Sequence, residues 1–279
     1  MRRINSDFRT KFISEEGQKL SNRDYFGYVE MDDFACYVLA DSLDGESGSN
    51  SAQFVVESLI RCFGEGPTMR KGRLRRYINE AHRELRRMRG GMHLKASLVM
   101  VVTDYKKMRC CHVGNSRLYL LRNSRFLLKT RDQSLTSNLL DEKKIPLDAA
   151  EAHEERNNLY SCLGGPQKPK PVISKKLRLE DGDILEIMTR GVWENCKEAE
   201  LLEISEAAKE PEEILNKAED IILSRQEEHA IDNYSLAVTF VDKVFHSPKK
   251  KPSIRQILMI AIPVVLLAGG IGLGLFFHN

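Results

Sequence analysis

Four short apolar segments separated by turn residues most strongly constrain the fold of this 279-residue chain. They occupy residues 96–103, 107–113, 117–121 and 125–129. Short strands joined by turns that contain Asp, Gly, Asn or Ser are typical of an antiparallel meander. Further strands are predicted at 25–30, 34–40, 172–179, 183–189 and 235–241. The segment 34–40 is apolar on both faces, which predicts a strand inside a layered structure.

Residues 70–89 are predicted to form an amphipathic helix. Its apolar positions alternate between steps of four and three, at Leu74, Ile78, Ala81, Leu85 and Met88. The other face has nine Lys or Arg residues against Glu80 and Glu84, a net charge of +7. We consider a patch for nucleic acid or an acidic partner, a face toward anionic lipid, and a solvated face. No nucleic-acid-binding motif accompanies the helix, so we favour a solvated face and expect no nucleic-acid partner.

The composition is that of a globular protein with ample core, at 42% hydrophobic and 30% charged residues. Its net charge of +3 is too small to indicate a nucleic-acid binder. Six cysteines without zinc-like spacing, several inside apolar runs, favour a reduced cytosolic compartment. Helices are also predicted at 50–63, 134–143, 149–157 and after Pro211. Together with the strands they predict an α+β fold of two antiparallel sheets flanked by helices.

The C-terminal segment 257–277 contains no charged residue. Its 21 residues would form a helix of about 31 Å, which matches the roughly 30 Å hydrocarbon core of a bilayer. We therefore predict a membrane-spanning helix at 257–277, a basic juxtamembrane linker at 245–256 and a folded domain at 1–244. The span is preceded by the basic residues Lys249, Lys250, Lys251 and Arg255. Because positive charge stays on the cytoplasmic side of a membrane, this predicts a tail-anchored protein with a cytoplasmic domain.

Gly270 and Gly274 have GxxxG spacing inside this apolar segment. Such spacing allows two membrane helices to approach closely. A homodimer through these two glycines is one alternative, although the spacing is common by chance in Gly-rich segments.

Seven short motifs follow one another between about residue 8 and residue 243. They are Asn22-Arg23-Asp24, Leu39–Gly45, Gly114–Arg117, Thr130–Leu135, Leu163-Gly164, Gly182–Leu185 with Thr189–Trp193, and Asp232-Asn233. In type and order this series resembles the metal-dependent type 2C (PPM-type) protein serine/threonine phosphatases. The resemblance implies the αββα sandwich of that family.

In the family, two Mg²⁺ or Mn²⁺ ions bind to acids in these motifs and activate a water that attacks phosphoserine or phosphothreonine. Carried over by position, Asp41 and Asp232 remain as acids, and Ser42 still offers a backbone carbonyl. Arg23 and Arg190 stand where the family has two further acidic ligands. The position of the phosphate-contacting arginine is Lys19, which attracts phosphate as a point charge, and Asn115 replaces an acid near an accessory metal.

The charges at the four ligand positions sum to zero without any metal, since two are arginines and two are aspartates. We expect the guanidinium groups to occupy the space of the metals and to pair with Asp41 and Asp232, because unpaired buried carboxylates are costly. A dication beside two arginines would be repelled. The alternative is a shifted alignment in which Asp24, Asp44 or Glu194 supplies ligands.

These replacements predict a membrane-tethered, catalytically impaired type 2C phosphatase-like protein that acts as a binding or regulatory module in phosphoprotein signalling. Its expected partners are a phosphoprotein, a kinase or a protein of a membrane complex, and no catalytic residue or cofactor is assigned. The alternative is an active protein serine/threonine phosphatase that uses Mg²⁺ or Mn²⁺ in a rearranged site.

Overall fold

Strand β3 (Ala35–Ser42) explains why the chain folds into layers. Its residues from Ala35 to Ala40 are completely buried. Because successive side chains of a strand point to opposite faces, such a strand needs a packing layer on each side. Val38 packs with the helices on one side, and Leu39 packs with the second sheet on the other. The predicted interior strand is therefore confirmed.

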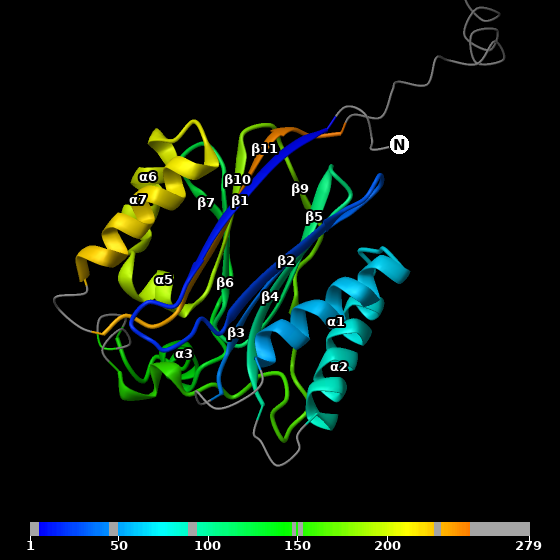
Figure 1. The fold of residues 1–279 in the computed structure, drawn as a ribbon. Coiled ribbons are helices and arrows are strands. Elements are labelled where there is room, and N and C mark those ends of the chain that lie inside the picture. Colours follow the sequence, from blue (N-terminus) through cyan, green and yellow to red (C-terminus); the bar gives the residue numbers. More distant parts are fainter. Residues whose placement is uncertain are drawn as a thin grey trace, which may run out of the picture. The chain divides into compact units, whose positions relative to one another are not determined.

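The computed structural model describes residues 6–44, 50–88, 94–146, 149, 153–225 and 230–245. Two antiparallel sheets lie face to face (Figure 1). The six-stranded sheet has the order β2-β3-β4-β5-β8, with β9 also paired to β5, and its other strands are β2 (Asp24–Glu30), β4 (Ala96–Thr103), β5 (Lys107–Val113), β8 (Val172–Ile173) and β9 (Leu177–Arg178). The five-stranded sheet has the order β1-β11-β10-β6-β7, built from β1 (Asp7–Glu15), β11 (Tyr234–Lys243), β10 (Asp183–Met188), β6 (Arg117–Leu121) and β7 (Phe126–Lys129).

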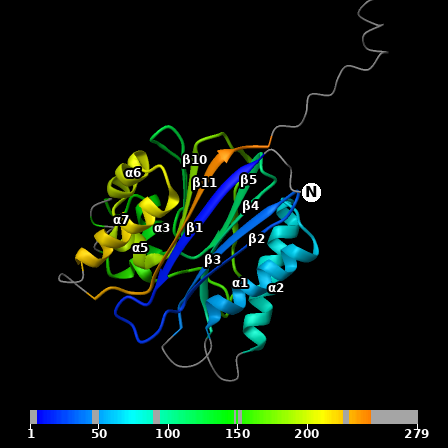
Figure 2. The same cartoon turned by 45° about the horizontal axis from the view of Figure 1, so that its top comes forward.

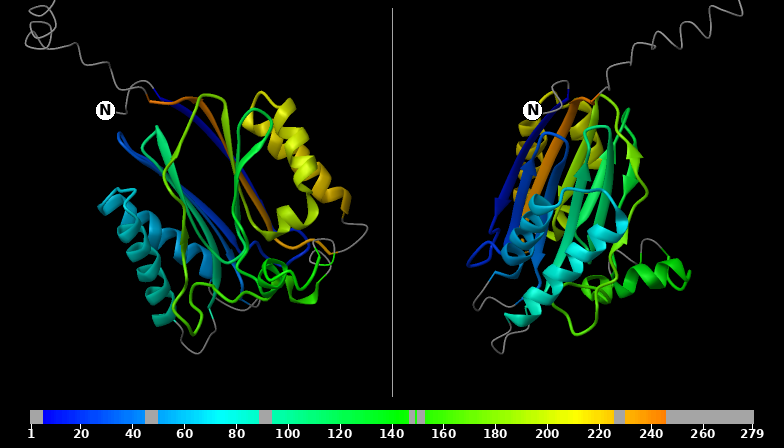
Figure 3. Two further views of the ribbon diagram at one scale, coloured as in Figure 1. Left: turned by 180° about the vertical axis from the view of Figure 1, so that it is seen from behind. Right: turned by 90° about the vertical axis from the view of Figure 1, so that its right-hand side faces the viewer.

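Helices cover the outer face of each sheet (Figures 2 and 3). Helices α1 (Ser51–Glu65) and α2 (Lys71–Arg87) pack on the six-stranded sheet. Helices α5 (Arg190–Asn195), α6 (Glu198–Ala207) and α7 (Pro211–Ser224) pack on the five-stranded sheet. Separate apolar clusters fill the space between the sheets and the space under each helical layer. The described chain has the predicted α+β architecture of two antiparallel sheets flanked by helices.

The N-termini of several helices follow local capping rules. Asn50 accepts a hydrogen bond from the backbone N–H of Gln53 at the start of α1. Ser134 does the same for the N–H of Ser137 in α3 (Leu135–Asp141). Pro211 begins α7, where its missing N–H costs nothing. Side-chain oxygens at such positions satisfy donors that the helix itself leaves unpaired.

Two predicted elements differ from the observed ones. Residues 172–179 form two short strands, because Ser174 interrupts the ladder and its Oγ accepts the hydrogen bond from the N–H of Cys110. Residues 149–157 were predicted to be helical, but in their described part the named element is the short 3₁₀ helix η1 (Glu154–Asn157). The sequence prediction also missed β1, α5 and α6.

The C-terminal predictions lie outside the described residues. This applies to the apolar segment 257–277, to Gly270 and Gly274 within it, and to the basic residues that precede it. Within the described ranges, none of the helices has both the length and the apolar character needed to cross a bilayer.

Candidate functional site

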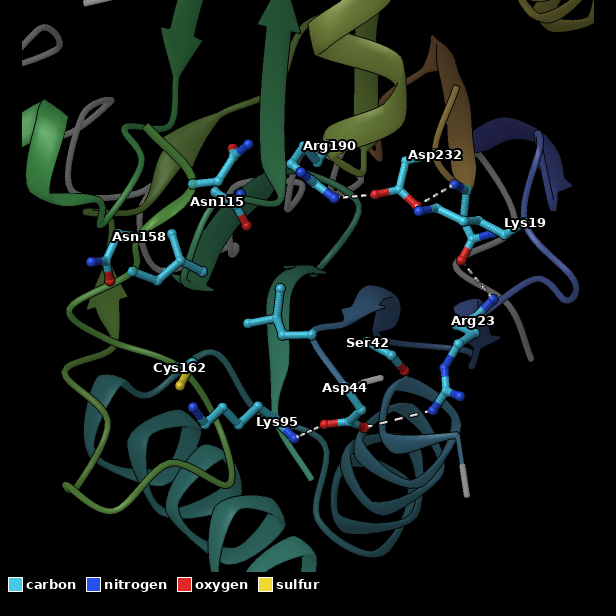
Figure 4. Close-up of a pocket in the computed structure, with 14 residues that line it drawn as sticks. Lys19, Arg23, Ser42, Asp44, Lys95, Asn115, Asn158, Cys162, Arg190 and Asp232 are labelled. Atoms are coloured by element: carbon cyan, nitrogen blue, oxygen red, sulfur yellow. Dashed lines mark hydrogen bonds and ion pairs between the residues drawn. The ribbon is translucent and has the colours of Figure 1, made fainter. Parts of the chain in front are cut away.

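The loops at one end of the two sheets enclose a cavity of about 490 Å³ (Figure 4). The motifs predicted to form the site meet here, although they lie far apart in the sequence. Its walls include the loop after β1, the end of β3, the loop before β11, the first turn of α5 and the segment 157–162. The predicted site residues that line the cavity are Lys19, Arg23, Ser42, Asn115, Arg190 and Asp232.

The guanidinium group of Arg190 lies between carboxylate groups of the site. Its guanidinium group forms an ion pair with the carboxylate of Asp232. The Glu194 carboxylate lies 3.9 Å from the same guanidinium, one helical turn further along α5. The predicted pairing of an arginine with Asp232 is thus present.

Gly191 fixes the position of Arg190. A Cβ atom at Gly191 would lie 2.1 Å from the backbone oxygen of Asn233. Only glycine therefore lets the first turn of α5 pack directly on the segment that precedes β11. This close approach holds Arg190 next to Asp232.

Asp24 and Asp41 lie opposite each other in the ladder between β2 and β3. Asp24 is buried, and the Thr189 hydroxyl donates a 2.7 Å hydrogen bond to its Oδ2. Burial raises the pKa of Asp24 to about 7. Burial also raises the pKa of Asp41 well above its ordinary value, the Asp24 carboxylate adds to this rise, and Arg190 opposes it. Asp41 is not among the residues that line the cavity, but Arg190 interacts with it electrostatically.

Arg23 is buried and faces Asp44, with a distance of 3.8 Å between Nη2 and Oδ2. The sequence prediction had paired it with one of the retained acids, Asp41 or Asp232. The Asp44 carboxylate also accepts a hydrogen bond from the backbone N–H of Lys95. The backbone N–H of Arg23 donates to Asn233 Oδ1 at 3.1 Å. Arg23 is therefore held in the wall of the cavity from both sides.

Lys95 lines the cavity and was missed by the sequence analysis. It directly precedes β4, where β4 pairs with the end of β3. Lys19 lies on the far side, with its Nζ 3.8 Å from Asp232 Oδ1. The cavity is thus lined by four cationic side chains and two carboxylates, a net charge of +2, and these residues are Lys19, Arg23, Lys95, Arg190, Asp44 and Asp232.

The side chain of Ser42, whose backbone carbonyl was predicted as a ligand, has a structural contact of its own. Its hydroxyl accepts a 3.0 Å hydrogen bond from the N–H of Ala52 and donates to Asn50. The side chain thus links the end of β3 to the start of α1.

The motifs around Arg117 and Asp132 form the frame of the site. Arg117 donates two hydrogen bonds of 2.9 Å to the carboxylate of Asp132, and its guanidinium carbon lies 3.7 Å from the centre of the Trp193 ring. Trp193 in turn donates to the backbone oxygen of Asn115 at 3.0 Å. These contacts join the start of β6, the loop after β7 and helix α5 beside the cavity, so Arg117, Asp132 and Trp193 support the cavity without lining it.

The carboxylate of Asp232, one of the ligand positions implied by the resemblance, faces cationic side chains in this structure. Magnesium and manganese need several oxygen ligands, but Arg190 and Lys19 already face the Asp232 carboxylate. In the described part of the chain, no group of three His, Cys, Asp or Glu residues is arranged to hold a metal ion. A dication would also lie close to a fixed guanidinium group and be repelled by it.

The alternative ligands considered from the sequence are also engaged with other groups. Asp24 accepts from Thr189, Asp44 faces Arg23, and Glu194 faces Arg190. A shifted set of ligands would therefore require these contacts to break.

Two antiparallel sheets between helical layers, with charged residues gathered on loops at one end, have the fold of the PPM-type phosphatases. In fold and in sequence the chain is similar to bacterial serine/threonine phosphatases of the PPM type (type 2C). Protein phosphatase PhpP of Streptococcus pneumoniae serotype 2 (strain D39) is 22% identical over 241 residues, which cover 83% of this chain and 96% of PhpP. No model of a protein family matches the chain.

Solved structures show the same fold. The serine/threonine phosphatase of S. agalactiae has a TM-score of 0.72 at 19% identity, covering 84% of this chain and 100% of that one. The catalytic domain of the phosphatase PstP, in complex with two manganese ions, has a TM-score of 0.67 at 20% identity, covering 84% and 98%. The arginines at positions 23 and 190 therefore stand within a complete phosphatase-like fold.

Proposed function

We propose that this chain is a catalytically impaired PPM-type domain that binds phosphorylated protein segments without a metal ion. The observation that carries the proposal is the ion pair of Arg190 with Asp232 inside a cavity with a net charge of +2. Arg190 is covalently part of the chain and supplies the positive charge that divalent cations supply in the similar enzymes.

The magnitude of the charge supports a phosphate ligand. A phosphorylated serine or threonine carries a charge of about −1.5 to −2 near neutral pH. The net charge of +2 around the cavity balances such a group without any dication. The cavity volume of about 490 Å³ is also within the usual range for small-ligand pockets. Lys19, Lys95 and Arg23 are the donors that we assign to the phosphate oxygens.

A second candidate function is an active, metal-dependent protein serine/threonine phosphatase. The sequence similarity to PhpP over 83% of the chain favours it, since PhpP is described as a protein phosphatase. In that case Arg190 would have to leave Asp232 before a metal could bind. The acids around Arg190 would then supply the ligands, and they are Asp24, Asp41, Glu194 and Asp232.

Calorimetric titration distinguishes the two candidates. The full chain in a neutral detergent is titrated with a phosphoserine peptide and with its unphosphorylated counterpart, in the presence of EDTA. We expect binding of the phosphorylated peptide alone, no heat from Mn²⁺ in a separate titration without EDTA, and no hydrolysis of an aryl phosphate. Mn²⁺-dependent hydrolysis that is lost in Asp41→Asn would establish the second candidate and overturn the first.

The membrane tether at 257–277 remains part of the proposal. It rests on the uncharged 21-residue segment and the basic residues before it. It places the binding cavity near membrane-bound phosphoproteins, kinases or membrane complexes. Extraction of the chain from membranes by alkaline carbonate, which releases proteins that do not span the bilayer, would contradict it.

A further inference from the structure

A second charged cavity lies along the outer side of α2 and shares no lining residue with the cavity at the loop end. Its volume is about 540 Å³. Five cationic side chains and no carboxylate line it, and the cations are Arg75, Arg76, Arg83, Arg86 and Lys168. We refer to it as the basic groove.

One wall of the basic groove is a continuous stripe on α2. Arg75, Arg76, Arg83 and Arg86 are spaced so that they share one side of the helix. From Arg75 to Arg86 the stripe is about 16 Å long, at roughly 1.5 Å per residue. All four side chains belong to exposed residues.

The other wall is the segment around Lys168, which is fixed against the helix. The backbone N–H of Gly164 donates a 3.0 Å hydrogen bond to Nδ1 of the buried His82 in α2. Gly164 has φ +71°, and a Cβ atom there would lie 2.1 Å from the backbone oxygen of Leu94. Arg86 contacts the oxygen of Pro166 at 3.4 Å. The groove is thus built from two segments far apart in the sequence, which packing holds together.

The positive charge of the groove is not neutralised locally. Glu84 of α2 pairs with Arg61, at 2.8 Å, on the side of α1. Within the described residues, none of the five groove cations forms an ion pair with a carboxylate. Five like charges along one groove repel one another, and a multivalent anion relieves that repulsion.

We propose that the basic groove binds a linear polyphosphate, a chain of phosphates joined by anhydride bonds. A row of cations about 16 Å long matches an anion with repeated charges better than a single phosphate. The groove is a concave cavity, whereas a bilayer presents a broad surface. None of the lining residues is aromatic, so the groove lacks the stacking platform that single-stranded nucleic acids use.

The test is a calorimetric titration of the full chain, in a neutral detergent, with a long-chain inorganic polyphosphate. We expect binding that weakens as the salt concentration rises. Charge reversal of the two central arginines, Arg76→Glu with Arg83→Glu, should lower the affinity by about tenfold or more, since it removes two phosphate contacts and adds two repulsive charges. The matched control, Lys209→Glu with Lys217→Glu, makes the same change in net charge at exposed positions in the helical layer that covers the other sheet.

The control pair should lower the affinity by less than about threefold, because distant exposed charges are screened. Equal losses in both pairs would show general attraction to a basic surface and overturn the proposal, as would an absence of binding at low salt. Tighter binding of phosphatidylglycerol vesicles or of single-stranded RNA, lost in the groove variant, would also overturn it. Thermal unfolding curves of the two variants check that both still fold.

Discussion

Replacement of Glu186 by Gln should change the pH dependence of stability. Glu186 lies on β10 beneath α6 and is completely buried. Ser205 donates a hydrogen bond to its Oε1, whereas Oε2 has no hydrogen-bond partner. Burial raises the pKa of Glu186 from 4.5 to about 7. Between pH 4.5 and about 7, Glu186 therefore keeps its proton in the folded protein but has released it in the unfolded chain.

The sign of the effect follows from this raised pKa. A carboxyl group with a raised pKa in the folded state contributes stability below pH 4.5, and this contribution is lost as the pH rises through about 7. Between pH 5 and pH 8 the loss amounts to roughly 2–3 kcal/mol. In Glu186→Gln this loss is absent. The new amide has its own cost of about 1–3 kcal/mol if its N–H₂ group is unpaired, but that cost is the same at both pH values.

Urea unfolding of the full chain in a neutral detergent, followed by the fluorescence of its single tryptophan, Trp193, measures this difference. Relative to the unmodified protein, the variant should gain roughly 2–3 kcal/mol in unfolding free energy between pH 5 and pH 8. Glu206→Gln on the exposed face of α6 is the control and should show no such gain. An equal change at both pH values would refute the reasoning, since it would mean that Glu186 is ionised at pH 5 as well.

Three further predictions concern the two cavities. The double variant Arg23→Glu with Arg190→Asp should bind Mn²⁺ in a calorimetric titration. Neither single variant should bind it, because one remaining guanidinium group still repels the ion. A double variant that folds but does not bind Mn²⁺ would contradict the account of charge replacement. Lys95→Ala should weaken binding of a phosphoserine peptide by about tenfold through loss of one charged hydrogen bond, while the exposed Lys107→Ala should leave it unchanged. Gly164→Ala should lower the unfolding free energy by about 3 kcal/mol or more, because the methyl group meets Leu94 at a positive φ, and a loss below about 1 kcal/mol in urea unfolding would show that the loop can shift.

The elements that were predicted correctly are those whose pattern reflects burial. β3 and β4 are apolar on both faces because each lies between a helical layer and the other sheet. The helical period of α2 is visible because one side of it packs into the core. β1 was missed because it is an edge strand, and its residues are only partly buried or exposed. Its pairing with β11 is a long-range contact that no local pattern records.

The same limit applies to the site. The positions of Arg23 and Arg190 were identified from motifs, and the pairing of Arg190 with Asp232 followed from charge. The contact of Arg23 with Asp44 and the presence of Lys95 were not predicted. Both depend on how the end of β3 and the start of β4 lie beside each other, and this is a property of the folded sheet.

The segment from Cys162 to Lys168 has a consequence for how mutations act in this protein. Cys162 lines the cavity at the loop end, and Lys168, six residues later, lines the basic groove. Between them, Leu163 pairs with Ala96 and Gly164 bonds to His82. Because these two contacts hold a segment that lines both cavities within seven residues, a substitution that displaces the segment will alter both cavities together. Substitutions in this segment should therefore impair ligand binding at both cavities, whereas substitutions elsewhere in the lining should impair only one.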